Sequence, residues 1–239
     1  MSPAANPSLP IMTAQASDVL RYADEFHSIT GISPDSRHDH LFDPEKFGID
    51  TYPCTTACWR GYVATYGLRG DHLVLEELCI NVSSKEWEAE HERLLKLKEA
   101  RRLIPPHRRG PKPQPRPMSP GPDGPAINGV LPKAGGRDSS FSDNYHNVGL
   151  PLPFSGGLMI GDDFVNDRYV HMGFQSAWKY RKVIEFRFKE GILAATYDRS
   201  ADMAAIREAN AGKDPDALGK PITPHGIAEW IGRRFDLGY

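Results

Sequence analysis

Hydrophobic and polar residues alternate along two stretches of the chain, and a short turn containing glycine interrupts each stretch. The first runs from Trp59 to Ile80 and turns at residues 69–71, and the second runs from Trp178 to Tyr197 and turns at residues 189–191. Runs of β-branched and aromatic residues joined by such a turn are typical of antiparallel hairpins. The pattern therefore predicts two hairpins of a sheet.

A different period, of three to four residues, predicts a helix near the start of the chain. Ser17 is a favourable N-cap and Gly31 is a favourable stop. The apolar side of this helix would carry Val19, Tyr22, Ala23 and Phe26. We expect the helix to pack on the sheet.

Three later segments also have helical patterns. The Ser-Ser-Lys-Glu sequence at residues 83–86 forms a capping-box motif for a charged helix that extends to about Arg102. A further helix is expected from Ser200 to Gly212. The last helix opens at Thr223-Pro224, and its apolar stripe consists of Ile227, Trp230, Ile231 and Phe235.

The segment at residues 104–148 differs in composition from the rest of the chain. Proline and glycine dominate it up to residue 136. A run of basic residues with no acidic residue among them leads into it: Arg101, Arg102, Arg108, Arg109, Lys112 and Arg116. The composition predicts an insertion or linker. It is either a solvated spacer or a docking arm for an acidic partner, phosphate or RNA, and the lack of interleaved aromatic residues favours the spacer.

Short strands are expected at residues 156–160 and 169–172, with an acidic turn at Gly161-Asp162-Asp163 between them. The order of the elements favours an α+β fold. We expect an antiparallel sheet built from two hairpins and additional short strands, flanked by helices. Residues 1–239 should form a single domain that contains the insertion.

Composition narrows the class of protein only slightly. A chain of 239 residues with 39% hydrophobic and 25% charged residues has ordinary globular composition. A formal net charge of −2 provides no global field for nucleic acid or for an anionic membrane, so any such binding must be local. Nucleic acid is not an expected partner, and the partner considered is a protein. The first ten residues lack the pattern of a secretion signal, and we expect a cytoplasmic location without membrane association.

Two groups of residues suggest metal binding, but neither completes a site. Cys54, Cys58 and Cys79 lack the second pair of ligands that a closed zinc site needs, so buried thiols are the favoured interpretation. His38-Asp39-His40 with Asp43 needs further ligands from elsewhere, and an exposed polar loop is favoured.

A third group, Asp162, Asp163 and Asp167 near His171, has the residue types for holding a divalent cation or for acid/base chemistry. An acidic turn between strands explains the same residues without chemistry. A fourth group consists of Arg60, His171 and Trp178. The Arg60 guanidinium is suited to a carboxylate or phosphate ligand. Because an unpaired buried arginine is costly, a partner side chain within the protein itself, such as a neighbouring aspartate, is favoured over a ligand.

Four segments resemble a family of uncharacterised bacterial proteins. They are residues 55–66, which contain Trp-Arg-Gly-Tyr, residues 73–75, residues 154–160, and residues 169–174, which contain Val-His-Met-Gly. Members of that family are similar in having a strand with each of these two motifs. The resemblance implies a bacterial source and no particular activity.

Two classes of function remain open. Because no catalytic motif is present, the sequence favours a bacterial binding or interaction module, such as an immunity or defence-associated protein. The alternative is a hydrolase or transferase with a pocket that gathers Arg60, His171 and the Asp162-Asp163 turn. In that pocket they would bind an anion, carry a proton and hold a metal, respectively. No cofactor and no oligomeric state follow from the sequence.

Overall fold

The computed structural model describes residues 14–34, 41–53, 55–114, 122–135, 139–169, 174–209 and 211. The helix expected after Thr223 lies outside the described residues. The candidate residues His38, His40, Cys54 and His171 also lie outside them.

Ten strands form one mixed sheet. They are β1 (Val19–Tyr22), β2 (Glu25–Pro34), β3 (Tyr62–Arg69), β4 (His72–Ile80), β5 (Lys133–Ala134), β6 (Asp143–Tyr145), β7 (Leu150–Pro151), β8 (Gly156–Phe164), β9 (Tyr180–Lys189) and β10 (Ile192–Asp198). Within the described residues, the α-helices are α1 (Lys85–Arg102) and α2 (Ser200–Ala209), and the short 3-10 helices are η1 (Pro44–Phe47), η2 (Pro106–Arg108), η3 (Asn166–Arg168) and η4 (Ala177–Lys179).

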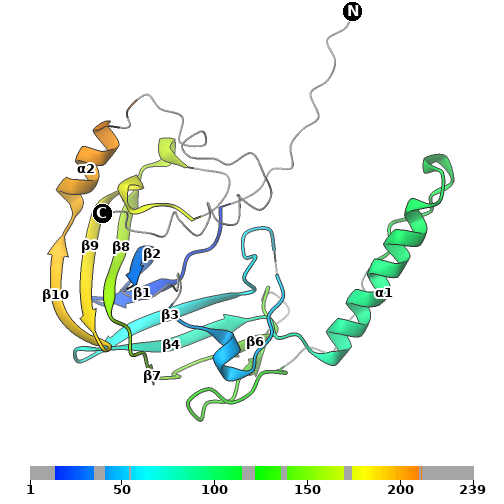
Figure 1. Ribbon diagram of the computed structural model, residues 1–239, viewed down its shortest axis with the longest axis horizontal. Helices are drawn as coiled ribbons and strands as arrows, with labels where there is room; N and C mark the ends of the chain where they lie inside the picture. The colour runs from blue at the N-terminus through cyan, green and yellow to red at the C-terminus, as the bar shows by residue number, and fades with distance from the viewer. Residues whose placement is uncertain are drawn as a thin grey trace, which may run out of the picture.

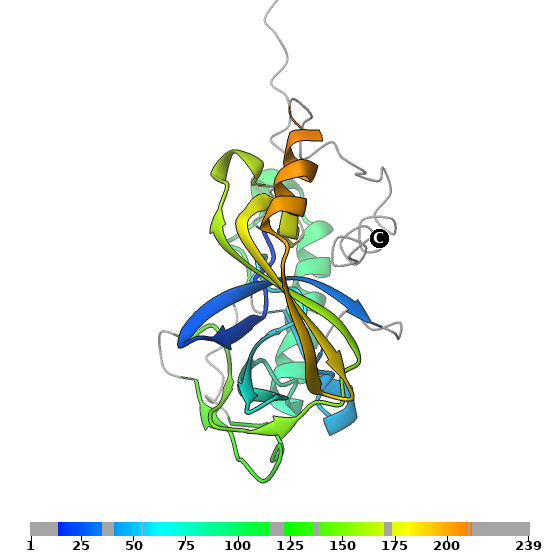
Figure 2. The same ribbon diagram turned by 90° about the vertical axis from the view of Figure 1, so that its left-hand side faces the viewer.

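The sheet closes on itself as a barrel. Its strand order is β10-β9-β8-β2-β1-β3-β4-β6-β5, and β10 also pairs with β4 at Ile192 and His72. Two backbone hydrogen bonds of 2.8 Å hold this join, from Leu73 N to Gly191 O and from Leu193 N to Asp71 O. All the pairs are antiparallel except β1 with β3, which is parallel. Figure 2 shows the strong twist between the blue β1–β2 hairpin and strands β8–β10.

Strand β4 is the best-paired strand in the barrel. One edge of β4 pairs with β3 along its whole length. The other edge is divided among three short partners: β10 at His72, β7 at Val74–Leu75 and β6 at Leu78–Ile80. Together these partners cover the second edge of β4, which would otherwise expose backbone groups that can pair with other chains.

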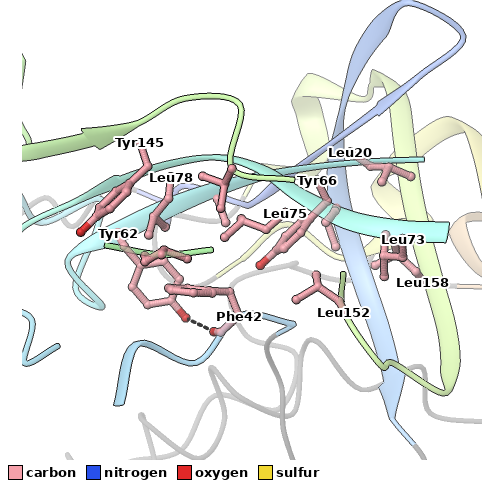
Figure 3. Close-up of a cluster of buried hydrophobic side chains, with 14 of the residues drawn as sticks. Leu20, Phe42, Tyr62, Tyr66, Leu73, Leu75, Leu78, Tyr145, Leu152 and Leu158 are labelled. Atoms are coloured by element: carbon pink, nitrogen blue, oxygen red, sulfur yellow. Dashed lines mark hydrogen bonds between the residues drawn. The ribbon is translucent and has the colours of Figure 1, made fainter. Parts of the chain in front are cut away.

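The barrel interior is filled by aliphatic and aromatic side chains. Figure 3 shows Tyr66, Leu75 and Leu158 among side chains that converge from several strands, together with Phe42, which precedes η1. Both Tyr66 and Leu75 are fully buried, and the Tyr62 hydroxyl donates a hydrogen bond of 3.0 Å to the Phe42 carbonyl. The polar ends of these tyrosines therefore find partners inside the core, as buried hydroxyls require.

The helix expected at residues 17–31 is wrong, because this segment forms the hairpin of β1 and β2. Ala23 and Asp24 both have positive φ, 52° and 64°, as a type I′ hairpin turn requires. Leu20 and Ile29 point into the core, whereas Phe26 is 67% exposed. The three-to-four-residue spacing of the apolar side chains did not reflect a helix. The alternation of the buried Leu20 with its less buried neighbours is the two-residue period of a strand.

Helices α1 and α2 differ in their relation to the sheet. Helix α2 buries Met203 against Met159 and Val183 on the outside of the barrel. Helix α1 projects away from the sheet (Figure 1), and its N-cap is Ser84, whose hydroxyl accepts from Trp87 N at 3.2 Å. The fold is therefore α+β with a mostly antiparallel sheet. The expected description of two hairpins flanked by helices is too simple for this closed barrel.

The strand start expected at residue 156 is confirmed, but the acidic turn expected at residues 161–163 is wrong. Strand β8 continues through these residues to Phe164 and pairs with β9 on the way. The basic insertion also contributes to the sheet. Ile127 within it is fully buried, and β5 and β6 extend the edge of β4.

Tyr145 gives the barrel a titration at high pH. Burial, together with the charge of Asp143, raises the pKa of Tyr145 to about 12, and its hydroxyl donates to Pro125 O at 2.8 Å. Tyrosine in an unfolded chain ionises with a pKa of about 10, so above this pH the unfolded state binds fewer protons than the folded state. We expect the free energy of unfolding to be unaffected by Tyr145 below pH ~10 and to fall as the pH rises towards ~12.

Absorbance at 295 nm, which follows tyrosine ionisation, checks this expectation. Tyr145→Phe should remove one late ionisation from the titration of the folded protein. An unchanged late phase in this variant would contradict the assignment.

Candidate functional site

A hollow of about 230 Å³ lies at one end of the barrel, where the turn of the β1–β2 hairpin meets β8 and β9. We call it the mouth hollow. Its apolar part consists of Tyr22, Ala23, Ile160 and Ile184, and its polar part of Glu25, His27, Asp162 and Lys182. Mouths of β-barrels are common ligand sites, and apolar linings with a few polar groups are typical of them.

The register of the strands explains why these side chains meet. Ile160 lies opposite Ile184, and Asp162 lies opposite Lys182, across β8 and β9. Because alternate residues of a strand share a face, each strand contributes one apolar and one charged side chain to the same side. Tyr22 packs its ring edge-on against Phe186, with ring centroids 4.9 Å apart, so the hollow opens directly over the core.

Charges of both signs surround the apolar part. Lys182 Nζ lies 3.3 Å from Asp162 Oδ2, and both side chains are largely exposed. A hydrogen bond of 2.8 Å from the Asp163 backbone N–H lowers the pKa of Asp162, and Lys182 contributes to the same shift. Asp162 is therefore ionised at neutral pH. A ligand in the mouth hollow would meet a cation and an anion side by side.

Arg60 lies in a second polar group, which is buried. Its guanidinium binds both oxygens of Asp18, from Nη1 at 3.0 Å and from Nη2 at 2.5 Å, and its Nε donates to Tyr62 O at 2.9 Å. Burial is the largest single effect on Arg60 and would lower its pKa, but the charge of Asp18, the nearby Tyr62 and Tyr66 and the hydrogen bond to Asp18 together outweigh it, so the pKa is raised. The expected protein partner of Arg60 is therefore Asp18.

Asp18 is the centre of this group. Its carboxylate also accepts from Ala64 N at 2.7 Å and from the Tyr66 hydroxyl at 3.3 Å. Burial and the Asp18 charge raise the pKa of Tyr66 well above its usual value. With four donors around one buried carboxylate, the group fastens the start of β1 to β3. The geometry of this group indicates that Arg60 stabilises the fold. It gives no indication that Arg60 binds a ligand.

The sequence candidates do not all meet at one place. Asp162 lines the mouth hollow, whereas the Asp163 carboxylate pairs with Arg181 Nη1 at 2.8 Å. Trp178 lies in η4, where its carbonyl accepts from Arg207. Arg60 binds Asp18, and Asp18 is four residues from Tyr22, which is about 13 Å along an extended strand.

The cysteine and histidine candidates contribute no site among the described residues. Cys58 is buried and its thiol donates to Tyr62 O at 3.3 Å, and burial raises the pKa of Cys79. Asp43 caps η1 by accepting from Glu45 N. Within the described ranges, no three His, Cys, Asp or Glu side chains gather closely enough to hold a metal ion.

Most of the residues that form the mouth hollow were not predicted from the sequence. Glu25 and His27 were missed because the hairpin that carries them was assigned to a helix. The available signal was the polar residue Asp24 in a two-residue turn between alternating segments, which is a weak form of the usual hairpin signature. Lys182 and Ile184 have ordinary strand surroundings and gave no signal.

No protein-family model, curated protein or solved structure matches the chain. The resemblance through the Trp-Arg-Gly-Tyr and Val-His-Met-Gly segments therefore stays a prediction. None of the helices in the described part is both long enough and apolar enough to cross a membrane.

Proposed function

We propose that this protein is a non-catalytic binding module whose barrel holds a small ligand in the mouth hollow. The observation that supports this most directly is the composition of the hollow, in which an apolar lining opens over the core beside paired opposite charges. Its volume of about 230 Å³ is below the ~300 Å³ at which pockets for drug-sized ligands begin. The ligand class is therefore a small molecule with an apolar body and a charged or zwitterionic head.

The alternative, a hydrolase or transferase, has less support. It requires Arg60 and the Asp162-Asp163 pair to act in one pocket. The Arg60 fork is occupied by Asp18, and Asp162 and Asp163 make separate ion pairs with Lys182 and Arg181. His171, which would carry the proton, lies outside the described residues.

Fragment binding measured by NMR tests the proposal. We expect small aromatic amino acids and amines to bind the unmodified protein and to shift signals from residues of the mouth hollow. Ile184→Trp would fill the hollow, so this variant should lose the binding. Ile192→Trp is the matched control, because Ile192 is 47% exposed and lies outside the hollow.

Equal fragment binding by the Ile184→Trp and Ile192→Trp variants would contradict the proposal. A complete lack of binding by the unmodified protein to anionic, cationic and zwitterionic fragments would contradict it as well.

A further inference from the structure

The helix α1 and the segment after it form an arm that stands away from the barrel (Figure 1). We define the arm as residues 85–114. At its base, the ring of Trp87 stacks on Tyr52 with centroids 4.3 Å apart. Residues after α1 then return along the helix, because Arg101 Nη2 donates to Gly110 O at 2.6 Å and Arg93 Nη2 donates to Gln114 O at 3.1 Å.

Charge is unevenly distributed along the arm. Four glutamates lie in the first half of α1: Glu86, Glu88, Glu90 and Glu92. The far end, which we call the arm tip, comprises residues 101–112 and contains no acidic residue. Its cations are Arg101, Arg102, Arg108, Arg109 and Lys112. An acidic surface would therefore be attracted to the tip and repelled by the base.

The arm tip also exposes apolar side chains between its cations. Leu103 is 85% exposed and Ile104 is 40% exposed. Arg109 is held in place by donating to Ile104 O at 2.8 Å, which keeps the turn compact. Arg102 and Arg108 form no ion pair with any residue of the described ranges, so their guanidinium groups remain available to a partner.

We propose that the arm tip docks an acidic polypeptide that carries apolar residues among its carboxylates. Arginine is enriched at protein interfaces and binds carboxylates through two parallel hydrogen bonds, and four of the five cations are arginines. Nucleic acid fits less well, because single-strand binding uses aromatic stacking and the arm tip has no Phe, Tyr or Trp. An anionic membrane fits less well because membrane-surface helices bury a long apolar face, whereas the large apolar side chains that the arm tip exposes are Leu103 and Ile104.

A synthetic peptide of glutamate and leucine is the probe, and binding to the full chain is measured by fluorescence anisotropy. Arg102→Glu combined with Arg108→Glu should weaken binding about tenfold or more. Lys85→Glu combined with Lys189→Glu, which changes the net charge equally away from the tip, should change it less than about twofold. Circular dichroism of both variants should match that of the unmodified protein, since all four residues are exposed.

The apolar contribution has its own pair of variants. Leu103→Ser should weaken binding of the peptide, whereas Leu131→Ser, at a leucine that is 71% exposed outside the arm, should not. An oligonucleotide and anionic phospholipid vesicles are tested in parallel. The proposal is overturned if the peptide does not bind, if the two charge variants bind it equally, or if either alternative probe binds more tightly than the peptide.

Discussion

Replacing Asp18 with alanine should lower the free energy of unfolding by about 3–5 kcal/mol, the usual cost of removing one member of a buried ion pair. The substitution would leave the Arg60 guanidinium without the carboxylate that it binds, and the Arg60 side chain is only 22% exposed. It would also leave Ala64 N–H and the Tyr66 hydroxyl without their acceptor. Urea unfolding followed by tryptophan fluorescence measures the loss.

Two further variants separate charge from hydrogen bonding at this position. Asp18→Asn keeps an oxygen that can accept from Ala64 N, so it should lose less stability than Asp18→Ala. Asp162→Ala removes an aspartate from an exposed pair with Lys182 and should cost below about 1 kcal/mol. Losses of similar size in Asp18→Ala and Asp162→Ala would show that the buried group does not fasten β1 to β3.

Phe186→Ala should cost about 3–5 kcal/mol, because the ring is fully buried and its removal leaves a cavity in the barrel. The ring contacts Tyr22 edge-on, so the cavity would also undermine the apolar side of the mouth hollow. Phe26→Ala is the matched control. Phe26 is 67% exposed, and its loss should change stability by less than about 0.5 kcal/mol.

The same urea titration measures both phenylalanine variants. If Phe186→Ala and Phe26→Ala destabilise the protein equally, the arrangement of the β1–β2 hairpin over β9 is incorrect. A large loss from Phe186→Ala alone supports the burial of this ring against Tyr22 of the β1–β2 hairpin.

Local sequence patterns predicted several elements because those elements depend on neighbouring residues. Strands β3 and β4 follow the alternation of residues 62–80 around the turn at Gly70, which has φ of 61°. Helix α1 begins one residue later than the capping box at residues 83–86 predicts, because the N-cap is Ser84, whose hydroxyl accepts from Trp87 N. In such elements, the turn and cap residues are as informative as the apolar positions.

The sites depended on contacts between distant segments, and sequence patterns do not record such contacts. Arg60 was correctly expected to have a protein partner, but nothing in the sequence indicated Asp18, which is 42 residues away. The mouth hollow required the register of β8 against β9 and of β2 against β8. Asp162 was selected for its acidic neighbours, whereas its role at the hollow comes from Lys182 on another strand.

The sequence by itself determined where β3, β4, β9, β10 and the two α-helices form, because hydrophobic period, turns and caps act over a few residues. It also determined that the arm tip is basic, since charge is a property of composition. Tertiary structure decided that residues 19–34 are a hairpin, that β10 meets β4, and that Asp18 meets Arg60. The physical reason is that a closed barrel stabilises the local conformation that pairs its backbone groups and fills the core. This holds even where the local sequence pattern favours a different conformation.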